Sequence, residues 1–362
     1  MKRLIAGTAA ALLAAVLILP VQANAVSAHS AILLDAATGR VLYEKQADEQ
    51  SLIASTTKIM TALVVCEQCN VLDRVRVPRE AVGIEGSSMY LQEGEILTIQ
   101  ELLYGLMLHS GNDAAVALAI YCGGTVEGFA QLMNDKAHQL GLENTHFENP
   151  HGLDAPGHHS TARDLAALAA YAMENPIFAK TVSTKTVTVG QRYLRNHNKL
   201  LWQVEGADGI KTGYTRAAGR ILVSSAKREG RRLIAVTINA PDDWQDHATL
   251  LNNGFRDFSN RRVVTAGDCV GRIEIAGGQS MSVELLATEN FDYAMMDDER
   301  PELVIPGPGF VYAPVAEGAY AGVAHVCING KSVGTVRLVY GQTVELIPEE
   351  KQPFWKRVIG GN

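Results

Sequence analysis

The sequence has little of several features that would place it in other classes of protein. It has five cysteines, too few for a disulfide scaffold and too scattered for a structural zinc site. Aromatic residues make up 6 % of the chain and the formal net charge is −7, so no basic surface for nucleic acid is indicated. No internal repeat or low-complexity tract is present. With 47 % hydrophobic and 20 % charged residues, the chain has the composition of a protein that folds around a buried core.

The N-terminus has the pattern of a secretory signal peptide. Two cations precede an uncharged run at 4–19, which is followed by Pro20 and an A-x-A site at 23–25. The uncharged run is 16 residues long, whereas a membrane-spanning helix needs roughly 20. We therefore expect residues 1–25 to be a cleaved signal peptide. The protein is then exported and acts outside the cytoplasm, at the cell-wall and membrane face or as a secreted protein.

The hydrophobic pattern within residues 26–262 predicts strands, then helices, then strands. Residues 30–45 predict two strands around a turn, and apolar residues then recur at helical spacing, first at 59–66. Strands are predicted again later in this region, at 209–215, 221–226 and 233–238. This order predicts an α+β fold, in which one antiparallel sheet is built from both ends of the region and helices pack on it.

The pattern changes again after residue 262. Short β-rich segments separated by Gly, Pro or Asn predict a small all-β domain at 263–348. The remaining residues, 349–362, form a short tail that contains FWKRVI, whose aromatics and cations suit a membrane interface. So short a tail cannot form a stable isolated helix in water. We expect weak, salt-sensitive membrane contact, and the alternative is a tail that packs on the β-rich domain.

The first of three motifs with candidate chemistry is S-x-x-K, formed by Ser55 and Lys58 at the start of a predicted helix. Residues three apart on a helix face the same side, so the hydroxyl and the amine can meet. A lysine can activate a serine nucleophile only if the pKa of the lysine is lowered. By itself the motif is weak, because a capping serine beside a surface lysine also fits and a second S-x-x-K occurs at 224–227.

The other two motifs are Ser110-x-Asn112, between two predicted helices, and Lys211-Thr212-Gly213, on a predicted strand. Each occurs once in the chain. Taken singly, they also fit a helix-cap loop and an edge-strand lysine beside a bulge glycine. Because all three motifs lie in fitting local structure, we interpret them as parts of one catalytic cleft.

The three motifs resemble those of the penicillin-recognising serine acyl-enzymes. Their surroundings resemble the low-molecular-mass penicillin-binding proteins that are serine-type D-alanyl-D-alanine carboxypeptidases. The similar segments lie at 35–63, 86–95, 102–119, 149–169 and 208–228. The resemblance implies a penicillin-binding and β-lactamase-like transpeptidase fold followed by a small all-β domain. It also implies an enzyme that removes the terminal D-alanine from peptidoglycan stem peptides, needs no cofactor or metal, and is inhibited covalently by β-lactam antibiotics.

The resemblance assigns catalytic roles to four residues. Ser55 is the nucleophile that becomes acylated, and Lys58 takes its proton. Ser110 relays a proton to the departing D-alanine. Asn112 holds Lys58 and the substrate amide.

The resemblance also assigns the substrate-binding strand. Lys211 and Thr212 bind the terminal carboxylate, and Lys211 keeps the pKa of the first-motif lysine low by like-charge repulsion. Gly213 has no side chain, which lets the substrate lie against the strand as an added β-partner. The backbone N–H groups of Ser55 and Tyr214 form the oxyanion hole.

Two other functions fit the same motifs. A β-lactamase-like hydrolase shares them, but it usually lacks the C-terminal β domain and uses a carboxylate-activated water, for which the sequence has no motif. A catalytically silent penicillin-binding or wall-binding module is the second alternative, and the intact serine and lysines argue against it.

Several polar residues receive no functional role from the sequence. His197 lies in a loop near the expected carboxylate site but is not assigned, and no physical account is available for Arg220. The histidines at 151, 158 and 159 lack the spacing of a metal site. We expect Cys66 and Cys69 to pack rather than to form a redox pair, and we leave the pairing of Cys66, Cys69, Cys122, Cys269 and Cys327 open.

Overall fold

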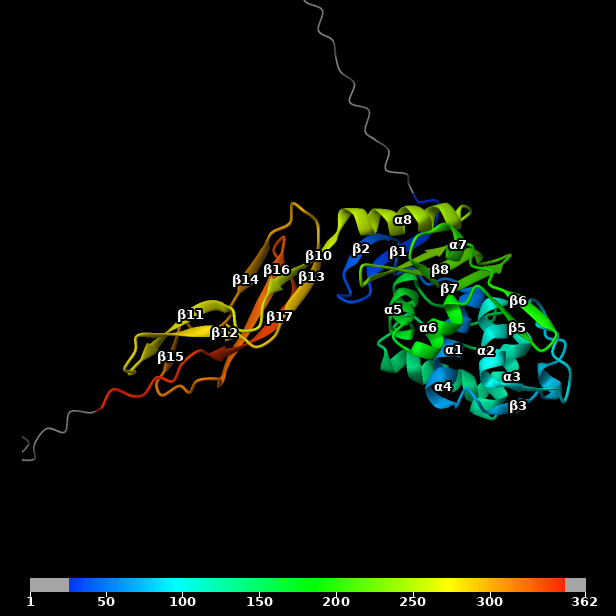
Figure 1. Cartoon of the computed structure of the whole chain (residues 1–362), viewed down its shortest axis with the longest axis horizontal. Coiled ribbons are helices and arrows are strands. Elements are labelled where there is room, and N and C mark those ends of the chain that lie inside the picture. The colour runs from blue at the N-terminus through cyan, green and yellow to red at the C-terminus, as the bar shows by residue number, and fades with distance from the viewer. Residues whose placement is uncertain (1–25, 349–362) are drawn as a thin grey trace, which may run out of the picture.

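The computed structural model describes residues 26–348 (Figure 1). The predicted signal peptide and the predicted membrane-contacting tail lie outside the described residues. Figure 1 shows a larger part that carries all the labelled helices and a smaller part made of strands β10 to β17. The larger part contains the three motifs.

The larger part is organised around a five-stranded antiparallel sheet with the strand order β2-β1-β9-β8-β7. Its strands come from both ends of this part of the chain, as the sequence predicts: β1 Ser30–Asp35, β2 Val41–Lys45, β7 Ala207–Thr215, β8 Gly219–Arg228 and β9 Arg231–Ile238. Both faces of the sheet are covered, so β1 is buried along its whole length. Ile32 and Leu34 join one hydrophobic core, and Ala31 and Leu33 join another on the opposite face, as the two-residue repeat of a strand requires.

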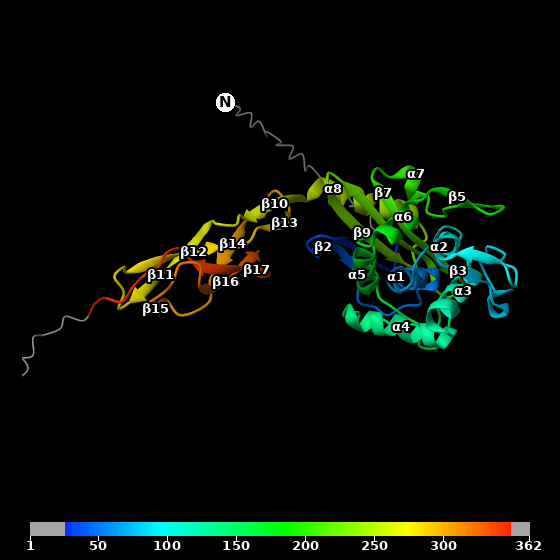
Figure 2. The same cartoon turned by 60° about the horizontal axis from the view of Figure 1, so that its bottom comes forward.

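Helices cover the two faces unequally (Figures 1 and 2). The amphipathic helix α8 Asp243–Asp257 lies along one face, where its Leu250 and Leu251 are buried together with Leu200 of the short helix α7 (Leu200–Gln203). The other face carries the larger core and most of the helices: α1 Lys58–Gln68, α2 Ile99–Leu108, α3 Asn112–Gly123, α4 Val126–Gln139, α5 Ala162–Ala172 and α6 Pro176–Ser183. Figure 2 shows α8 on one side of the sheet and α1, α4 and α5 on the other.

Short elements connect these layers and border the motif region. They are η1 Ala54–Thr57, β3 Arg74–Arg76, η2 Arg79–Ala81, β4 Ile96–Thr98, β5 Thr186–Val189, β6 Arg192–Arg195 and α7 Leu200–Gln203. Thr161 caps the N-terminus of α5, because its side chain accepts from the Asp164 N–H.

The smaller part consists of a six-stranded sheet and one two-stranded sheet. The six-stranded sheet has the order β14-β16-β17-β12-β11-β15 and is antiparallel except for the β11–β15 pair. Its strands are β11 Cys269–Ala276, β12 Ser282–Ala287, β14 Pro301–Val304, β15 Phe310–Tyr312, β16 Tyr320–Ile328 and β17 Lys331–Tyr340. The pair is β10 Ser259–Val264 with β13 Phe291–Met295. The boundary expected between 262 and 263 therefore falls inside β10.

One expectation about the cysteines is wrong. Cys69 does not pack as a free thiol but forms a disulfide with Cys122, whose Cα lies 6.7 Å away. Cys69 caps the C-terminal end of α1 and Cys122 lies in the last turn of the neighbouring helix α3. The partners are 53 residues apart, so local spacing gave no signal. Cys66 is buried and free, as expected.

The helices of the described part of the chain are short compared with a membrane span. Within 26–348, no single helix is both long and apolar enough to cross a bilayer. Helices α3 and α4 meet the length and composition test only as a pair bent by 82°.

Candidate active site

The nucleophile candidate Ser55 lies on the short helical turn η1, directly before α1. The preceding residue, Ala54, has φ = 45°, a left-handed conformation that costs a non-glycine residue about 1 kcal/mol or more. Tertiary contacts hold this turn in place. Gly152, with φ = +85°, sits so close behind it that a Cβ there would overlap the carbonyl of Ala54. The turn presents the Ser55 hydroxyl to a cleft.

Lys58 begins α1 and is fully buried, and its amine lies at the centre of the three motifs. Its Nζ donates to Ser55 Oγ at 2.9 Å and to Asn112 Oδ1 at 2.7 Å. A third bond goes to the carbonyl oxygen of His151 at 2.6 Å. The amine therefore has three oxygen acceptors and no carboxylate among its hydrogen-bond partners in the described part of the chain.

The environment of the two buried lysines favours their neutral forms. Burial, followed by the charge of Lys211, lowers the pKa of Lys58 well below its ordinary value of 10.5, while Asp113 opposes the shift. Burial lowers the pKa of Lys211 to about 7. A lysine whose ammonium form is disfavoured in this way can accept a proton near neutral pH, which a surface lysine cannot do.

The second motif lies in the loop between α2 and α3. Ser110 is almost fully buried and has φ = 62°, and Asn112 is the first residue of α3. The Asn112 side chain is fixed at both ends, because its Nδ2 donates to the Glu85 carbonyl at 2.5 Å while its Oδ1 accepts from the lysine. Asp113 also holds the segment before β4, since its carboxylate accepts from the Ser88 hydroxyl at 2.6 Å. These bonds fix the orientation of the amide toward the cleft.

The third motif lies on β7, at the edge of the sheet. Lys211 is buried and its Nζ donates to the Thr212 carbonyl at 2.8 Å. Gly213 faces η1, and a Cβ on it would come within 3.2 Å of the Ile53 carbonyl, so a larger side chain would push β7 away from the serine turn. The next residue, Tyr214, is 68 % exposed.

The three motifs surround a cleft of about 360 Å³. Its lining includes five of the predicted site residues, Ser55, Ser110, Thr212, Gly213 and Tyr214. Ser87 and His197 also line it. Lys58 and Asn112 contact the cleft through Ser55 and each other, and Lys211 lies buried beneath it. The structure therefore brings all eight predicted site residues together.

The cleft also contains residues to which the sequence assigned no role. Arg220 lies opposite Tyr214 in the β7–β8 register, and its guanidinium donates to both carboxylate oxygens of Asp243, at 2.7 and 2.9 Å. This pair and Trp244 line one wall of the cleft. Asp243 is the first residue of α8, which packs on the opposite face of the sheet from α1, so no local pattern in the sequence indicates this pair.

His197 lines the same cleft from the loop after β6. Part of its side chain reaches solvent, yet desolvation of the ring in the cavity wall and the charge of Lys211 lower the pKa of His197 to about 4. The imidazole is therefore neutral near pH 7. It can donate a hydrogen bond to a ligand but brings no positive charge.

The other histidines have structural surroundings. The buried His158 ring contacts the Thr57 hydroxyl at 2.7 Å and accepts from the Glu148 N–H, and His247 lies between the hydroxyls of Ser224 and Thr237. Within residues 26–348, no group of three or more His, Cys, Asp or Glu side chains could hold a metal ion. The second S-x-x-K forms no site, because Ser224 is buried on His247 while Lys227 is exposed.

Comparison with known proteins agrees with this geometry. The family model described as D-alanyl-D-alanine carboxypeptidase matches residues 19–242, and that of the penicillin-binding protein 5 C-terminal domain matches 258–346. The D-alanyl-D-alanine carboxypeptidase DacF of Bacillus subtilis is 34 % identical over 313 residues, 82 % of this chain and 80 % of that protein. DacC of Escherichia coli is 35 % identical over 345 residues, covering 90 % and 86 %. The structure of penicillin binding protein 5 from Haemophilus influenzae aligns with a TM-score of 0.76 at 30 % identity, covering 88 % of this chain and 98 % of that chain.

The fold and the motif-lined cleft are those of a low-molecular-mass penicillin-binding protein. The chain belongs to the D-alanyl-D-alanine carboxypeptidase family and is a serine-type peptidase. The predictions of family, fold class and enzyme class are confirmed. The β-lactamase-like and catalytically silent alternatives are set aside.

Proposed function

We propose that this enzyme removes the terminal D-alanine from peptidoglycan stem peptides that end in D-Ala-D-Ala, through an acyl-enzyme on Ser55. The observation that carries the proposal is the buried amine of Lys58, which bonds to Ser55 Oγ and Asn112 Oδ1 and whose pKa is lowered well below its ordinary value by burial and by the charge of Lys211. A neutral amine at 2.9 Å from a hydroxyl has the position and the basicity of a general base.

Acylation follows from these positions. Ser55 Oγ attacks the carbonyl carbon of the penultimate D-alanine while its proton passes to Lys58 Nζ. The backbone N–H groups of Ser55 and Tyr214 stabilise the oxyanion. The C–N bond then breaks, and the proton that Lys58 took from Ser55 passes through Ser110 to the nitrogen of the departing D-alanine, which leaves Lys58 able to accept a proton again. Water hydrolyses the ester, with Lys58 again accepting a proton, and the serine hydroxyl is restored.

Substrate binding uses the β7 strand. Lys211 and Thr212 hold the free carboxylate of the terminal D-alanine, which requires the substrate to end in an acid. The Asn112 side chain hydrogen-bonds to the substrate amide. The absence of a side chain at Gly213 lets the peptide run beside β7. β-Lactam antibiotics present a carboxylate and a strained amide in the same arrangement, and would acylate the same serine.

The function is tested with the purified chain lacking residues 1–25. Incubation with a pentapeptide ending in D-Ala-D-Ala should release one free D-alanine per peptide, and Ser55→Ala should release none while keeping its thermal unfolding profile. Turnover by the Ser55→Ala protein would overturn the assignment of the nucleophile. Absence of D-alanine release by the wild-type chain would overturn the substrate.

We also propose that the enzyme works outside the cytoplasm. The signal-peptide pattern at 1–25 supports export, and the Cys69–Cys122 disulfide supports an oxidising compartment. Weak contact of the tail at 349–362 with the membrane surface is part of this proposal. Co-sedimentation with anionic vesicles, with and without residues 353–362 and at low and high salt, tests it. Binding that neither salt nor truncation changes would show that the tail is not the contact.

A further inference from the structure

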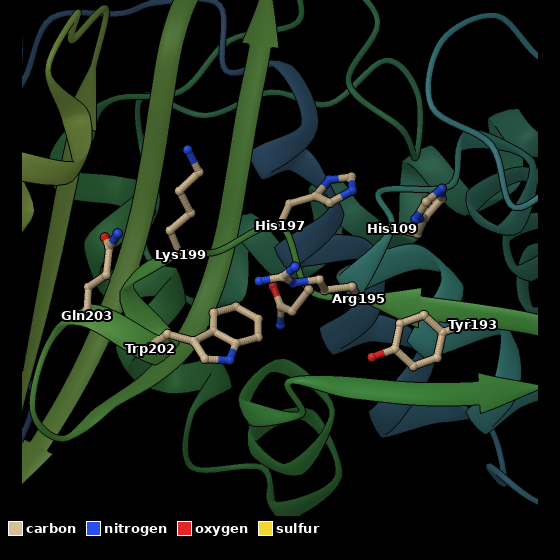
Figure 3. Close-up of a pocket in the computed structure, with 8 residues that line it drawn as sticks. His109, Tyr193, Arg195, His197, Lys199, Trp202 and Gln203 are labelled. Atoms are coloured by element: carbon tan, nitrogen blue, oxygen red, sulfur yellow. The ribbon is translucent and has the colours of Figure 1, made fainter.

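A second, larger cavity adjoins the catalytic cleft. Its volume is about 800 Å³, and it is lined by His109, Tyr193, Arg195, Asn196, His197, Lys199, Trp202 and Gln203 (Figure 3). Two of these residues, His197 and Lys199, also line the catalytic cleft. The two spaces are therefore neighbours on either side of these two residues.

The cavity is cationic and aromatic. Arg195 and Lys199 are exposed cations, no carboxylate lines the cavity, and neither cation has an ion-pair partner among residues 26–348. The guanidinium of Arg195 lies 5.0 Å from the centre of the Trp202 ring. Figure 3 shows these two side chains next to each other. Trp202 and Tyr193 are themselves 43 % and 67 % exposed. A guanidinium stacked on an indole keeps its planar edge of N–H donors free for a carboxylate.

The cavity lies at one particular end of the substrate strand. The loop that carries His197 is tied to the first half of β7, because Asn198 Nδ2 donates to the Gly209 carbonyl at 2.7 Å. His197 also lies close enough to Lys211 for the charge of Lys211 to help lower the pKa of His197. Tyr214 is at the other end of the motif. With the terminal carboxylate on Lys211 and Thr212, this end of the strand is where the residue after the scissile bond leaves.

We propose that this cavity is a subsite for the leaving residue and that Arg195 makes it selective for an acidic side chain there. The inference rests on the proposed function, since it uses the carboxylate position given by Lys211 and Thr212. The side-chain carboxylate pairs with the Arg195 guanidinium, while its methylene groups lie against Trp202. The favoured substrates are acyl-D-Ala-D-Xaa peptides in which Xaa carries a second carboxylate.

The test compares leaving residues of different charge, with glutamate and glutamine as a pair of equal size. Four peptides acyl-D-Ala-D-Xaa, with Xaa as alanine, glutamate, glutamine or lysine, are cleaved by the wild-type enzyme, and released D-Xaa is measured by chiral mass spectrometry. We expect kcat/KM for glutamate to exceed that for glutamine roughly threefold to fivefold, the size of one partly exposed charge pair, and lysine to be poorest. The preference should shrink at high salt.

Variants assign the preference to one residue. In Arg195→Gln, the kcat/KM values for glutamate and glutamine should become equal. In Arg195→Glu, lysine should become the favoured leaving residue, a result that misfolding cannot produce. The matched control is Lys185→Gln, which removes a cation that lies 5.8 Å from the centre of the Trp202 ring but does not line the cavity. This variant should keep the ratio. A second peptide set places the extra carboxylate before the scissile D-alanine, where Arg195 should have no effect.

The outcomes separate this inference from the proposed function. Release of D-alanine with equal rates for glutamate and glutamine, or a ratio that persists in Arg195→Glu, would overturn the subsite while leaving the carboxypeptidase activity intact. A charge effect on the acyl side alone would place the cavity on the wrong side of the scissile bond. Failure to release D-alanine from acyl-D-Ala-D-Ala would instead overturn the proposed function.

Discussion

A buried lysine with no carboxylate partner is costly unless it is neutral, and Lys58 is such a residue. Its pKa lies well below the ordinary 10.5, so acylation of Ser55 by penicillin should rise with pH and level off well before that value. Lys58→Arg should be nearly inert, because a guanidinium does not lose its proton in proteins. Intact-mass measurement of the acylated fraction against time, over a range of pH, checks both statements. Acylation of Lys58→Arg at a near-normal rate would rule out the base.

The charge on Lys211 is the second cause of that lowered pKa. Lys211→Gln should therefore raise the pKa of Lys58 and move the rise in acylation rate to higher pH, whatever happens to the maximal rate. The matched control is Lys227→Gln, at an exposed lysine in the second S-x-x-K, which should leave the profile in place. An unchanged profile in Lys211→Gln would show that the two lysines do not interact.

The residues that the sequence could identify are those that share a short motif. Ser55 with Lys58, and Lys211 with Thr212, are close along the chain, so helix and strand geometry already places them together. The Arg220–Asp243 pair and the Cys69–Cys122 bond join segments 23 and 53 residues apart, and no local pattern links them. Burial of both motif lysines is likewise a property of the assembled layers.

At the level of elements, the position of the serine turn depends on the loop behind it. Gly152→Ala should strongly impair acylation and stability, because its φ of +85° is unfavourable for alanine and the new Cβ would overlap the backbone of Ala54. Thermal unfolding and penicillin acylation measure the two effects. The backbone cannot yield without moving the residue before the nucleophile.

The matched control is Gly157→Ala in the same loop. Its φ is +91°, so the conformational cost is alike, but its Cβ would meet only the movable carboxylate of Glu148 at 2.6 Å. We expect a loss of stability of about 1 kcal/mol and near-normal acylation. Equal acylation defects in the two variants would mean that positive φ, rather than contact with Ala54, explains the effect.

Periodicity was sufficient to predict most elements of the catalytic part. The five sheet strands and the first helix, at 58–68, lie where the apolar spacing put them, because each buries one face or both. The two-stranded sheets β3–β4 and β5–β6 were not predicted. They contain three or four residues per strand and have too few alternations to stand out, yet β6 leads into the loop that carries His197.

The whole molecule should lose stability in mild acid. Burial lowers the pKa of His158 to about 4 and that of His247 to about 3, against 6.5 for a free histidine. Below pH 6.5 these histidines are protonated in the unfolded chain but stay neutral in the folded chain. The free energy of unfolding therefore falls as pH falls, by about 2 kcal/mol per histidine between pH 7 and 5. Urea unfolding at pH 7, 6 and 5 measures this slope. The slope should be smaller in His247→Gln, and an equal slope in that variant would exclude the histidine as its source.

The two parts of the molecule are joined by an ion pair between a partly buried arginine and a buried glutamate. Arg40, on the turn after β1, donates to both carboxylate oxygens of Glu299 at 2.6 and 2.7 Å, and to the Ala294 carbonyl at 2.5 Å. The guanidinium also lies about 5 Å from the rings of Phe258 and Tyr293. Glu299 is only 4 % exposed, so removal of its partner leaves an unpaired charge buried in the interface.

Arg40→Ala should therefore lower the free energy of unfolding by about 3 kcal/mol, whereas Arg40→Met combined with Glu299→Leu should recover most of that loss, since no unpaired charge then remains. Calorimetric unfolding of the single and double variants, with Arg261→Ala at the exposed Asp297 pair as the control, measures the difference. Penicillin acylation at 25 °C should be unchanged in all of them, because Arg40 does not line the catalytic cleft. If Arg40→Ala and the double variant are equally destabilised, the packing of these side chains, and not the charge, is what holds the β-rich part against the catalytic part.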